Sequence, residues 1–220
     1  MDSDRNVVDR VIKGRRSIRA FEDRAVSRAE IEDLLEIARW APSGSNSQPW
    51  RVTVAAGEPA ERLRAALLEA ADGHTFTAQQ AEGYRNRIAS GPMAWMLDQI
   101  DEPVDRYLTR GSMSFYGAPV ALVVSYPGTA GSTTPAGIPA FVTTLMLAAE
   151  ARGLGTIWLG WPLGQPQIVR SALGIGEDEQ LGAFVALGYP DRQAPVNRAR
   201  APRQAPSTFS RWIGWNEGAV

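Results

Sequence analysis

Along much of the chain, apolar residues recur every three to four positions, which is the period of an α-helix. Before Gly14, valine and isoleucine recur at helical spacing, which predicts a first amphipathic helix. Ser27 and Glu30 form a capping box, so a second helix is predicted from there until Pro42 stops it. Further helices are predicted over residues 60–71, 141–152 and 166–173.

Short apolar runs between the helices predict the strands of a sheet. Residues 118–125 form a nearly continuous, valine-rich run, which is typical of a strand buried on both faces. The other predicted strands cover residues 51–55, 156–160 and 181–187. This interleaving of strands and helices predicts an α+β fold, with the sheet as the middle layer of a three-layer α-β-α sandwich.

Three segments depart from this pattern, but no repeat or linker divides the chain, so we predict one domain over residues 1–220. Residues 72–110 scatter aromatic side chains among charges and prolines, which predicts a helical excursion from the core. Residues 126–139 are rich in glycine, threonine and proline and predict a mobile loop. Residues 190–220 predict an extended C-terminal arm.

Two apolar features predict that two copies of the chain associate. The predicted helix at 141–152 is apolar on most faces and suits a dimer core. The arm ends in large apolar residues that its own short segment cannot bury, namely Phe209, Trp212, Ile213 and Trp215. We therefore expect a homodimer in which the arm embraces the second subunit.

Composition excludes several classes of chemistry. The chain has no cysteine, which rules out disulfides, thiolate catalysis, iron–sulfur clusters and cysteine-bound zinc. The single histidine, His74, leaves no spare for a catalytic triad and no histidine cluster, so no metal site is predicted. A net charge of −1 predicts neither nucleic-acid nor membrane binding. With no spanning apolar stretch and no signal peptide, the chain is expected to be cytoplasmic.

The main candidate for binding chemistry is the segment Arg15-Arg16-Ser17-Ile18-Arg19, which follows the first helix. Three guanidinium forks and a hydroxyl group within five residues form a donor set suited to a phosphate or another oxyanion. The alternative is a solvated basic turn whose arginines pair with surface acids.

A second candidate lies at residues 42–50, before the first predicted strand. Pro42 ends the helix and Pro49 forces the preceding residue to be extended, so a plain connection between helix and strand is one explanation. The segment holds more hydrogen-bonding capacity than such a turn requires, in Ser43, Ser45, Asn46, Ser47 and Gln48.

These two segments, in this order and with one helix between them, resemble the FMN-dependent nitroreductase family. In that family an RRSxR-like and a PSxxNxQPW-like segment together bind the flavin. The resemblance continues over residues 116–120, 148–156 and 188–190, and lies nearest the subgroup that acts on nitroaromatics such as nitrobenzoates. It implies a central mixed sheet, a dimer with a C-terminal extension, bound FMN, and NADPH or NADH as co-substrate. Thr143-Thr144 departs from the polar Gln-Asn pair of many relatives.

The resemblance also implies roles for individual basic residues. Arg15 and Ser17 would meet the FMN phosphate and ribityl chain, with Arg16 close beside them. Arg203, together with Arg200, would complete the phosphate clamp.

The remaining implied contacts concern the flavin ring. Arg19 would lie beside the pyrimidine N1 and C2 oxygen, where a fixed cation favours reduction, although a surface pairing with Glu22 or Asp23 competes with this role. Leu159 and Gly160 would offer backbone groups to the N5 edge. The other subunit would line the far side of the ring with Pro42, Ser43, Gly44, Ser45 and Asn46.

The implied activity is that of an FMN-dependent NAD(P)H oxidoreductase that reduces nitroaromatic or quinone-type acceptors by a ping-pong mechanism. Because the flavin carries the electrons, no catalytic side chain is predicted. Two alternatives stay open. One is an oxygen-dependent flavin-modifying or dehalogenating relative, and the other is a non-catalytic flavin-binding protein.

Overall fold

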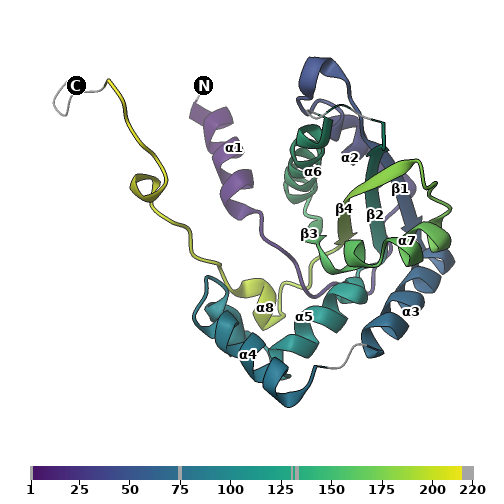
Figure 1. Ribbon diagram of the computed structural model, residues 1–220. Coiled ribbons are helices and arrows are strands. Elements are labelled where there is room, and N and C mark those ends of the chain that lie inside the picture. Colours follow the sequence, from purple (N-terminus) through teal and green to yellow (C-terminus); the bar gives the residue numbers. More distant parts are fainter. Residues whose placement is uncertain (1, 74–75, 130, 132–133, 215–220) are drawn as a thin grey trace.

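The computed structural model describes residues 2–73, 76–129, 131 and 134–214 (Figure 1). His74 and Trp215, on which two of the expectations above rest, lie outside the described residues. The helices are α1 (Asp2–Gly14), α2 (Arg28–Ala38), α3 (Glu58–Asp72), α4 (Ala78–Ala89), α5 (Val104–Met113), α6 (Thr134–Ala151), α7 (Pro166–Leu173) and α8 (Pro195–Arg198). The strands are β1 (Arg51–Ala56), β2 (Val120–Pro127), β3 (Gly155–Leu159) and β4 (Glu179–Gly188).

The strands form one four-stranded sheet in the order β1-β2-β4-β3, and each neighbouring pair is antiparallel. The expectation of a mixed sheet is therefore corrected. The parallel component within the described chain is a single bridge between Ser17 and Thr156, at the outer edge of β3. β2 and β4 are the two central strands, and each runs antiparallel to both of its neighbours.

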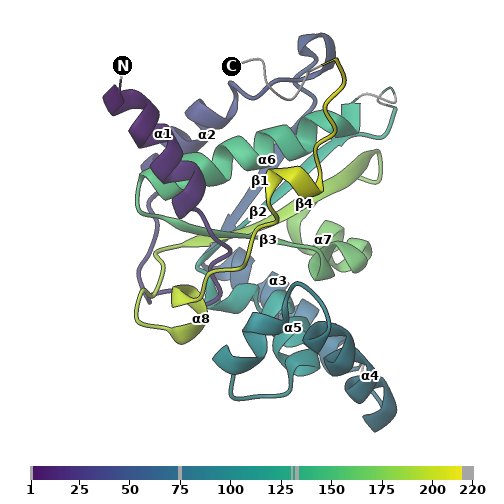
Figure 2. The ribbon, with the colours of Figure 1, turned by 90° about the vertical axis from the view of Figure 1, so that its left-hand side faces the viewer.

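The sheet is the middle of three layers, as Figure 2 shows, with α1, α2 and α6 on one side and α3 and α7 on the other. On β2, Leu122 faces α2 and α6, whereas Val123 faces α3 and α7. β4 alternates in the same way, with Val185 on the first face and Phe184 on the second. Both faces are buried, which explains why these strands read as continuous apolar runs.

Local sequence signals set several helix boundaries. The capping box is present, since Ser27 Oγ accepts from the Glu30 amide and the Glu30 carboxylate accepts from the Ser27 amide. α7 spans the predicted residues 166–173 and ends at Gly174, which adopts the left-handed conformation.

The predicted loop at 126–139 is wrong over its second half, because α6 begins at Thr134 and runs through Pro139. Pro135 lies in the first turn, where a helix needs no amide donor. Ile138 and Phe141 are buried against the sheet, and this packing outweighs the helix-breaking residues around them.

Residues 76–113 lie beside the sandwich and contain α4, the short 3-10 helix η2 (Ala94–Gln99) and α5 (Figure 1). They have a small apolar cluster of their own, made by Ile88, Met96, Val104 and Leu108. After β4 the chain continues through α8 into an extended arm, on which Phe209 and Ile213 are exposed. In the part of the chain described, no helix combines the length and apolarity needed to cross a membrane.

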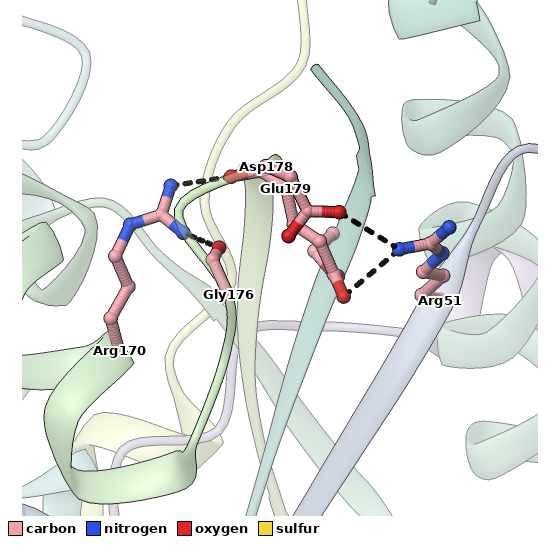
Figure 3. A network of polar contacts seen from close by, with 6 residues as sticks. Arg51, Arg170, Gly176, Asp178 and Glu179 are labelled. Carbon is pink, nitrogen blue, oxygen red and sulfur yellow. Dashed lines mark hydrogen bonds and ion pairs between the residues drawn. The ribbon is translucent and has the colours of Figure 1, made fainter. Parts of the chain in front are cut away.

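A polar network fastens the start of β4 (Figure 3). Arg170 of α7 is buried and donates to the carbonyl oxygens of Gly176 and Glu179. Arg51 of β1 lies 3.0 Å from the Glu179 carboxylate, which also accepts a hydrogen bond from Ser125. These contacts join α7, β1, β2 and β4 at one end of the sheet.

Candidate functional site

The arginine segment lies along the start of the edge strand β3. The Ile18 amide donates to the Thr156 carbonyl oxygen over 3.0 Å, and Ser17 bridges to Thr156 in parallel. Gly155 allows this approach, because a Cβ at that position would lie only 2.8 Å from Ile18 Cγ1. The backbone of the segment is thereby fixed against the sheet.

A cavity of about 230 Å³ opens beside this segment. Three parts of the chain that are far apart in sequence line it, namely the arginine segment, residues 92–95 of the excursion, and residues 196–203 after β4. The lining residues are Arg15, Ser17, Arg19, Pro92, Met93, Trp95, Val196, Ala199, Ala201, Pro202 and Arg203. All charged members of this set are arginines, so the cavity suits an anion.

The arginines of the cavity are close enough to repel one another. Burial and then repulsion from Arg203 lower the pKa of the Arg15 guanidinium below its ordinary value, while Glu150 opposes the shift. Within the described ranges, none of Arg15, Arg19 and Arg203 forms an ion pair with a carboxylate. The residues that line the cavity include no acid, so the cavity carries a net positive charge, which favours an anionic ligand.

Arg19 is held by its backbone while its side chain keeps donors to spare. Its amide donates to Asn197 Oδ1 over 2.8 Å, and one terminal nitrogen donates to the Ser17 carbonyl oxygen over 3.4 Å. Its Nε atom is buried and has no hydrogen-bond partner among the described residues. Neither Glu22 nor Asp23 forms an ion pair with it there, so the competing surface pairing is not observed.

Asn197, which the sequence analysis missed, joins two of the three segments that line the cavity, the arginine segment and residues 196–203. This buried side chain accepts from the Arg19 amide, and its Nδ2 donates to the carbonyl oxygens of Ala20 and Asp191 over 2.7 and 2.8 Å. All of its partners are distant in sequence or are backbone groups, so no local pattern signals the role. The arm is thereby positioned against the arginine segment.

Two of the predicted phosphate-binding residues point elsewhere. Arg16 donates to the Asn197 carbonyl oxygen over 2.8 Å, and Arg200 donates to the Lys13 carbonyl oxygen over 3.2 Å. Neither residue lines the cavity. Both guanidinium groups bind backbone instead and tie the arm to the end of α1 and the segment after it.

Apart from Arg19, the residues expected around the flavin ring do not line the cavity. The Pro42–Asn46 set, with Ser43, Gly44 and Ser45, lies near the start of α6, where a Cβ on Gly137 would be 3.4 Å from Ser43 Cβ. Leu159 is buried in the core at the end of β3, and Gly160 follows it at the surface. The cavity thus gathers Arg15, Ser17, Arg19 and Arg203 but not the remaining candidates.

Two tyrosines close to Arg19 were given no role in the site by the sequence analysis. The rings of Tyr107 and Tyr116 lie 5.5 Å apart, and Arg19 acts electrostatically on both hydroxyl groups. Burial raises the pKa of each tyrosine, so both stay protonated at neutral pH. Over the described residues, no group of three histidine, aspartate or glutamate side chains is arranged to hold a metal ion.

Comparisons with known proteins place this arrangement in a family. A model of the Nitroreductase family matches residues 12–189. The chain is 32% identical over 218 residues to a 4-nitrobenzoate reductase from Pseudomonas putida, covering 94% of this chain and 96% of that protein. It is 29% identical over 223 residues to a chloronitrobenzene nitroreductase from Comamonas testosteroni, covering 94% and 96%.

A solved structure shows the same fold. The structure is that of the FMN-dependent nitroreductase NfnB from Mycobacterium smegmatis in complex with NADPH, and it superposes with a TM-score of 0.79 at 29% identity. The match covers 95% of this chain and 99% of that one. The α+β sandwich and the arginine segment beside its edge strand define a protein of the nitroreductase class. The chain belongs to the nitroreductase family.

Proposed function

We propose that this protein binds FMN and uses NAD(P)H to reduce nitroaromatic compounds, with nitrobenzoates as the first candidates. The observation that carries the proposal is the cavity in which Arg15, Arg19 and Arg203 converge with no acidic side chain among the lining residues. The relatives named above supply the substrate class and the two cofactors.

The donor set of the cavity fits the phosphate end of FMN. A phosphate offers only acceptor oxygens, whereas guanidinium groups offer only donors. Arg15, Ser17 and Arg203 would hold the phosphate, and its charge would relieve the repulsion that lowers the pKa of Arg15. The unpartnered Nε of Arg19 would gain an acceptor as well.

Bound FMN would supply the hydride and electron transfer chemistry, so the role left to the chain's own residues is to position the cofactor and to polarise it. Asn197 fixes the Arg19 backbone, and the Arg19 guanidinium would supply a fixed positive charge to the flavin. Tyr107 and Tyr116 keep neutral hydroxyl groups near that charge.

We also propose that the active unit is a homodimer. The Pro42–Asn46 loop does not line the cavity of its own chain, and its residues are exposed or half-buried. Exposed apolar residues on α1, just after α2 and on the arm offer a surface for a second copy, including Val8, Ile12, Trp40 and Phe209. The loop of one subunit would then complete the site of its partner.

The test is NADPH and NADH oxidation by the purified protein, with and without 4-nitrobenzoate, at a measured FMN content. We expect one FMN per chain and oxidation that depends on the nitro compound, with parallel initial-velocity lines for a ping-pong mechanism. A quinone assayed in parallel defines the range of acceptors.

Other outcomes separate the alternatives. Product formation that requires oxygen and no nitro compound would indicate the flavin-modifying or dehalogenating class. FMN binding without NAD(P)H oxidation would indicate a non-catalytic flavoprotein. A chain that takes up no FMN contradicts the proposal altogether.

A further inference from the structure

Three buried polar atoms have no hydrogen-bond partner within the described part of the chain: Arg19 Nε, Trp95 Nε1 and Tyr107 Oη. Buried donors without acceptors are rare because each forfeits its bond to water. Of the three residues, Arg19 and Trp95 line the arginine cavity, whereas Tyr107 does not. The indole of Trp95 is therefore a buried donor beside a cation-rich cavity.

The chemistry of the cavity explains why Trp95 lacks a partner. An indole N–H can only donate, and the guanidinium groups of Arg15, Arg19 and Arg203 cannot accept. The charged groups around it compete with Trp95 for acceptors rather than supply them. An acceptor-rich anion in the cavity would satisfy all of these donors together.

Trp95 is held in place by its neighbours. It lies in η2, directly before Met96, which is fully buried in the small cluster of the excursion. η2 also contacts α8, the helix that carries Asn197 (Figure 1). The packing of η2 against α8 therefore fixes Trp95 relative to the segment that leads to Arg203.

We propose that Trp95 is an FMN-binding residue whose indole N–H donates to the cofactor phosphate, which makes the helical excursion part of the cofactor site. This inference rests on the proposed function, because it takes the ligand of the cavity to be the FMN phosphate. No polar or charged pattern in the sequence around Trp95 signals such a role.

The experiment compares Trp95→Phe with Tyr107→Phe in apoprotein retitrated with FMN and with riboflavin. Both substitutions keep an aromatic ring and remove one buried, unpartnered polar group, but only Trp95 lines the cavity. We expect Trp95→Phe to weaken FMN binding roughly tenfold, as for one charge-assisted hydrogen bond, and to leave riboflavin binding within about twofold. Tyr107→Phe should change the ratio of the two affinities by less than about twofold.

Thermal unfolding of the ligand-free variants guards against a folding defect. The Tyr107→Phe midpoint should equal or exceed that of the wild type, because its hydroxyl group has no partner to lose, whereas Trp95→Phe also loses the packing of the indole against its cluster and should melt slightly lower. The ratio of FMN to riboflavin affinity is independent of this loss. Unchanged FMN affinity in Trp95→Phe, or equal losses for FMN and riboflavin, would overturn this inference and leave the proposed function standing. If the wild-type protein binds no FMN, both fall.

Discussion

Two groups of arginines in this molecule are used in opposite ways. Arg170 and Arg51 direct their donors at carbonyl and carboxylate oxygens of the chain itself, where they fasten the start of β4 (Figure 3). Arg15, Arg19 and Arg203 converge on a cavity without an acid among its lining residues. The first group is satisfied by the fold, and the second is left with donors in excess.

The difference separates structural from binding arginines without reference to any ligand. A satisfied buried guanidinium stabilises the folded chain, and removing it leaves buried acceptors without donors. Clustered guanidinium groups repel one another, and an anion that enters offsets this repulsion. Substitutions in the first group should therefore act on stability, and those in the second on ligand affinity.

The largest effect is expected for Arg170→Ala. The Gly176 and Glu179 carbonyl oxygens would lose their donor at a buried position, which should lower the free energy of unfolding by about 3 kcal/mol. Urea unfolding measures the change, and FMN affinity below the transition should stay at the wild-type value. A loss well under 1 kcal/mol would place Arg170 outside the structural group.

Arg15→Ala should have the converse effect. FMN binding should weaken roughly tenfold or more, as for a charge-assisted hydrogen bond. The ligand-free protein should be as stable as the wild type or more so, because repulsion from Arg203 is relieved. The neighbouring Arg16→Ala is the matched control, since Arg16 binds a backbone carbonyl outside the cavity and should affect stability more than affinity.

Arg19→Gln tests whether the spare charge acts on the flavin ring. A cation beside N1 and the C2 oxygen favours the reduced cofactor, so its loss should lower the midpoint potential by roughly 30 mV for a tenfold change in preference. A redox titration of the FMN-loaded variant gives the value. If the potential does not move, Arg19 binds only the phosphate end.

The smallest effect is expected at Glu179, in the structural group. The hydrogen bond from Ser125, and then the contact with Arg51, hold the pKa of Glu179 below its ordinary value. Its contribution to stability is therefore present above the unfolded-state pKa, about 4.3, and is lost as the pH falls through the lower folded-state value.

Glu179→Gln should accordingly cost up to about 1 kcal/mol at neutral pH, and the difference from the wild type should vanish in acid. Urea unfolding over a pH series measures it. The exposed Glu69 of α3 provides the control, since it forms no ion pair among the described residues and Glu69→Gln should leave stability unchanged at neutral and acid pH. A difference between Glu179→Gln and the wild type that persists in acid would assign the loss to packing.

The elements with local signals were predictable from the sequence. The capping box at Ser27 and Glu30 is confirmed, and so are the bounds of α7, because caps and flanking glycine act over a few residues. The start of α6 could not be predicted, because the prolines at 135 and 139 favour a loop and only packing against the sheet overrides this preference.

The site residues differ in the same way, since some were predictable and others depend on long-range packing. The family resemblance pointed to Arg15, Ser17, Arg19 and Arg203, and the fold brings them to one cavity, while their roles toward FMN stay predictions. Arg16 and Arg200 carry the same side chain but point to backbone carbonyls, which depends on how the arm packs. Asn197 and Trp95 were missed for the same reason, because their partners lie far away in the sequence.

The clamp formed by Asn197 has a consequence for biosynthesis. It joins residues 19 and 20 to the segment after β4, so the arginine cavity has no second wall until the ribosome has made residue 197 and, soon afterwards, Arg203. A growing chain can assemble much of its sheet before that time, since domains fold progressively as they emerge. The anion site therefore forms only after all four strands of the sheet have been synthesised, and its ligand can bind only once residue 203 is available.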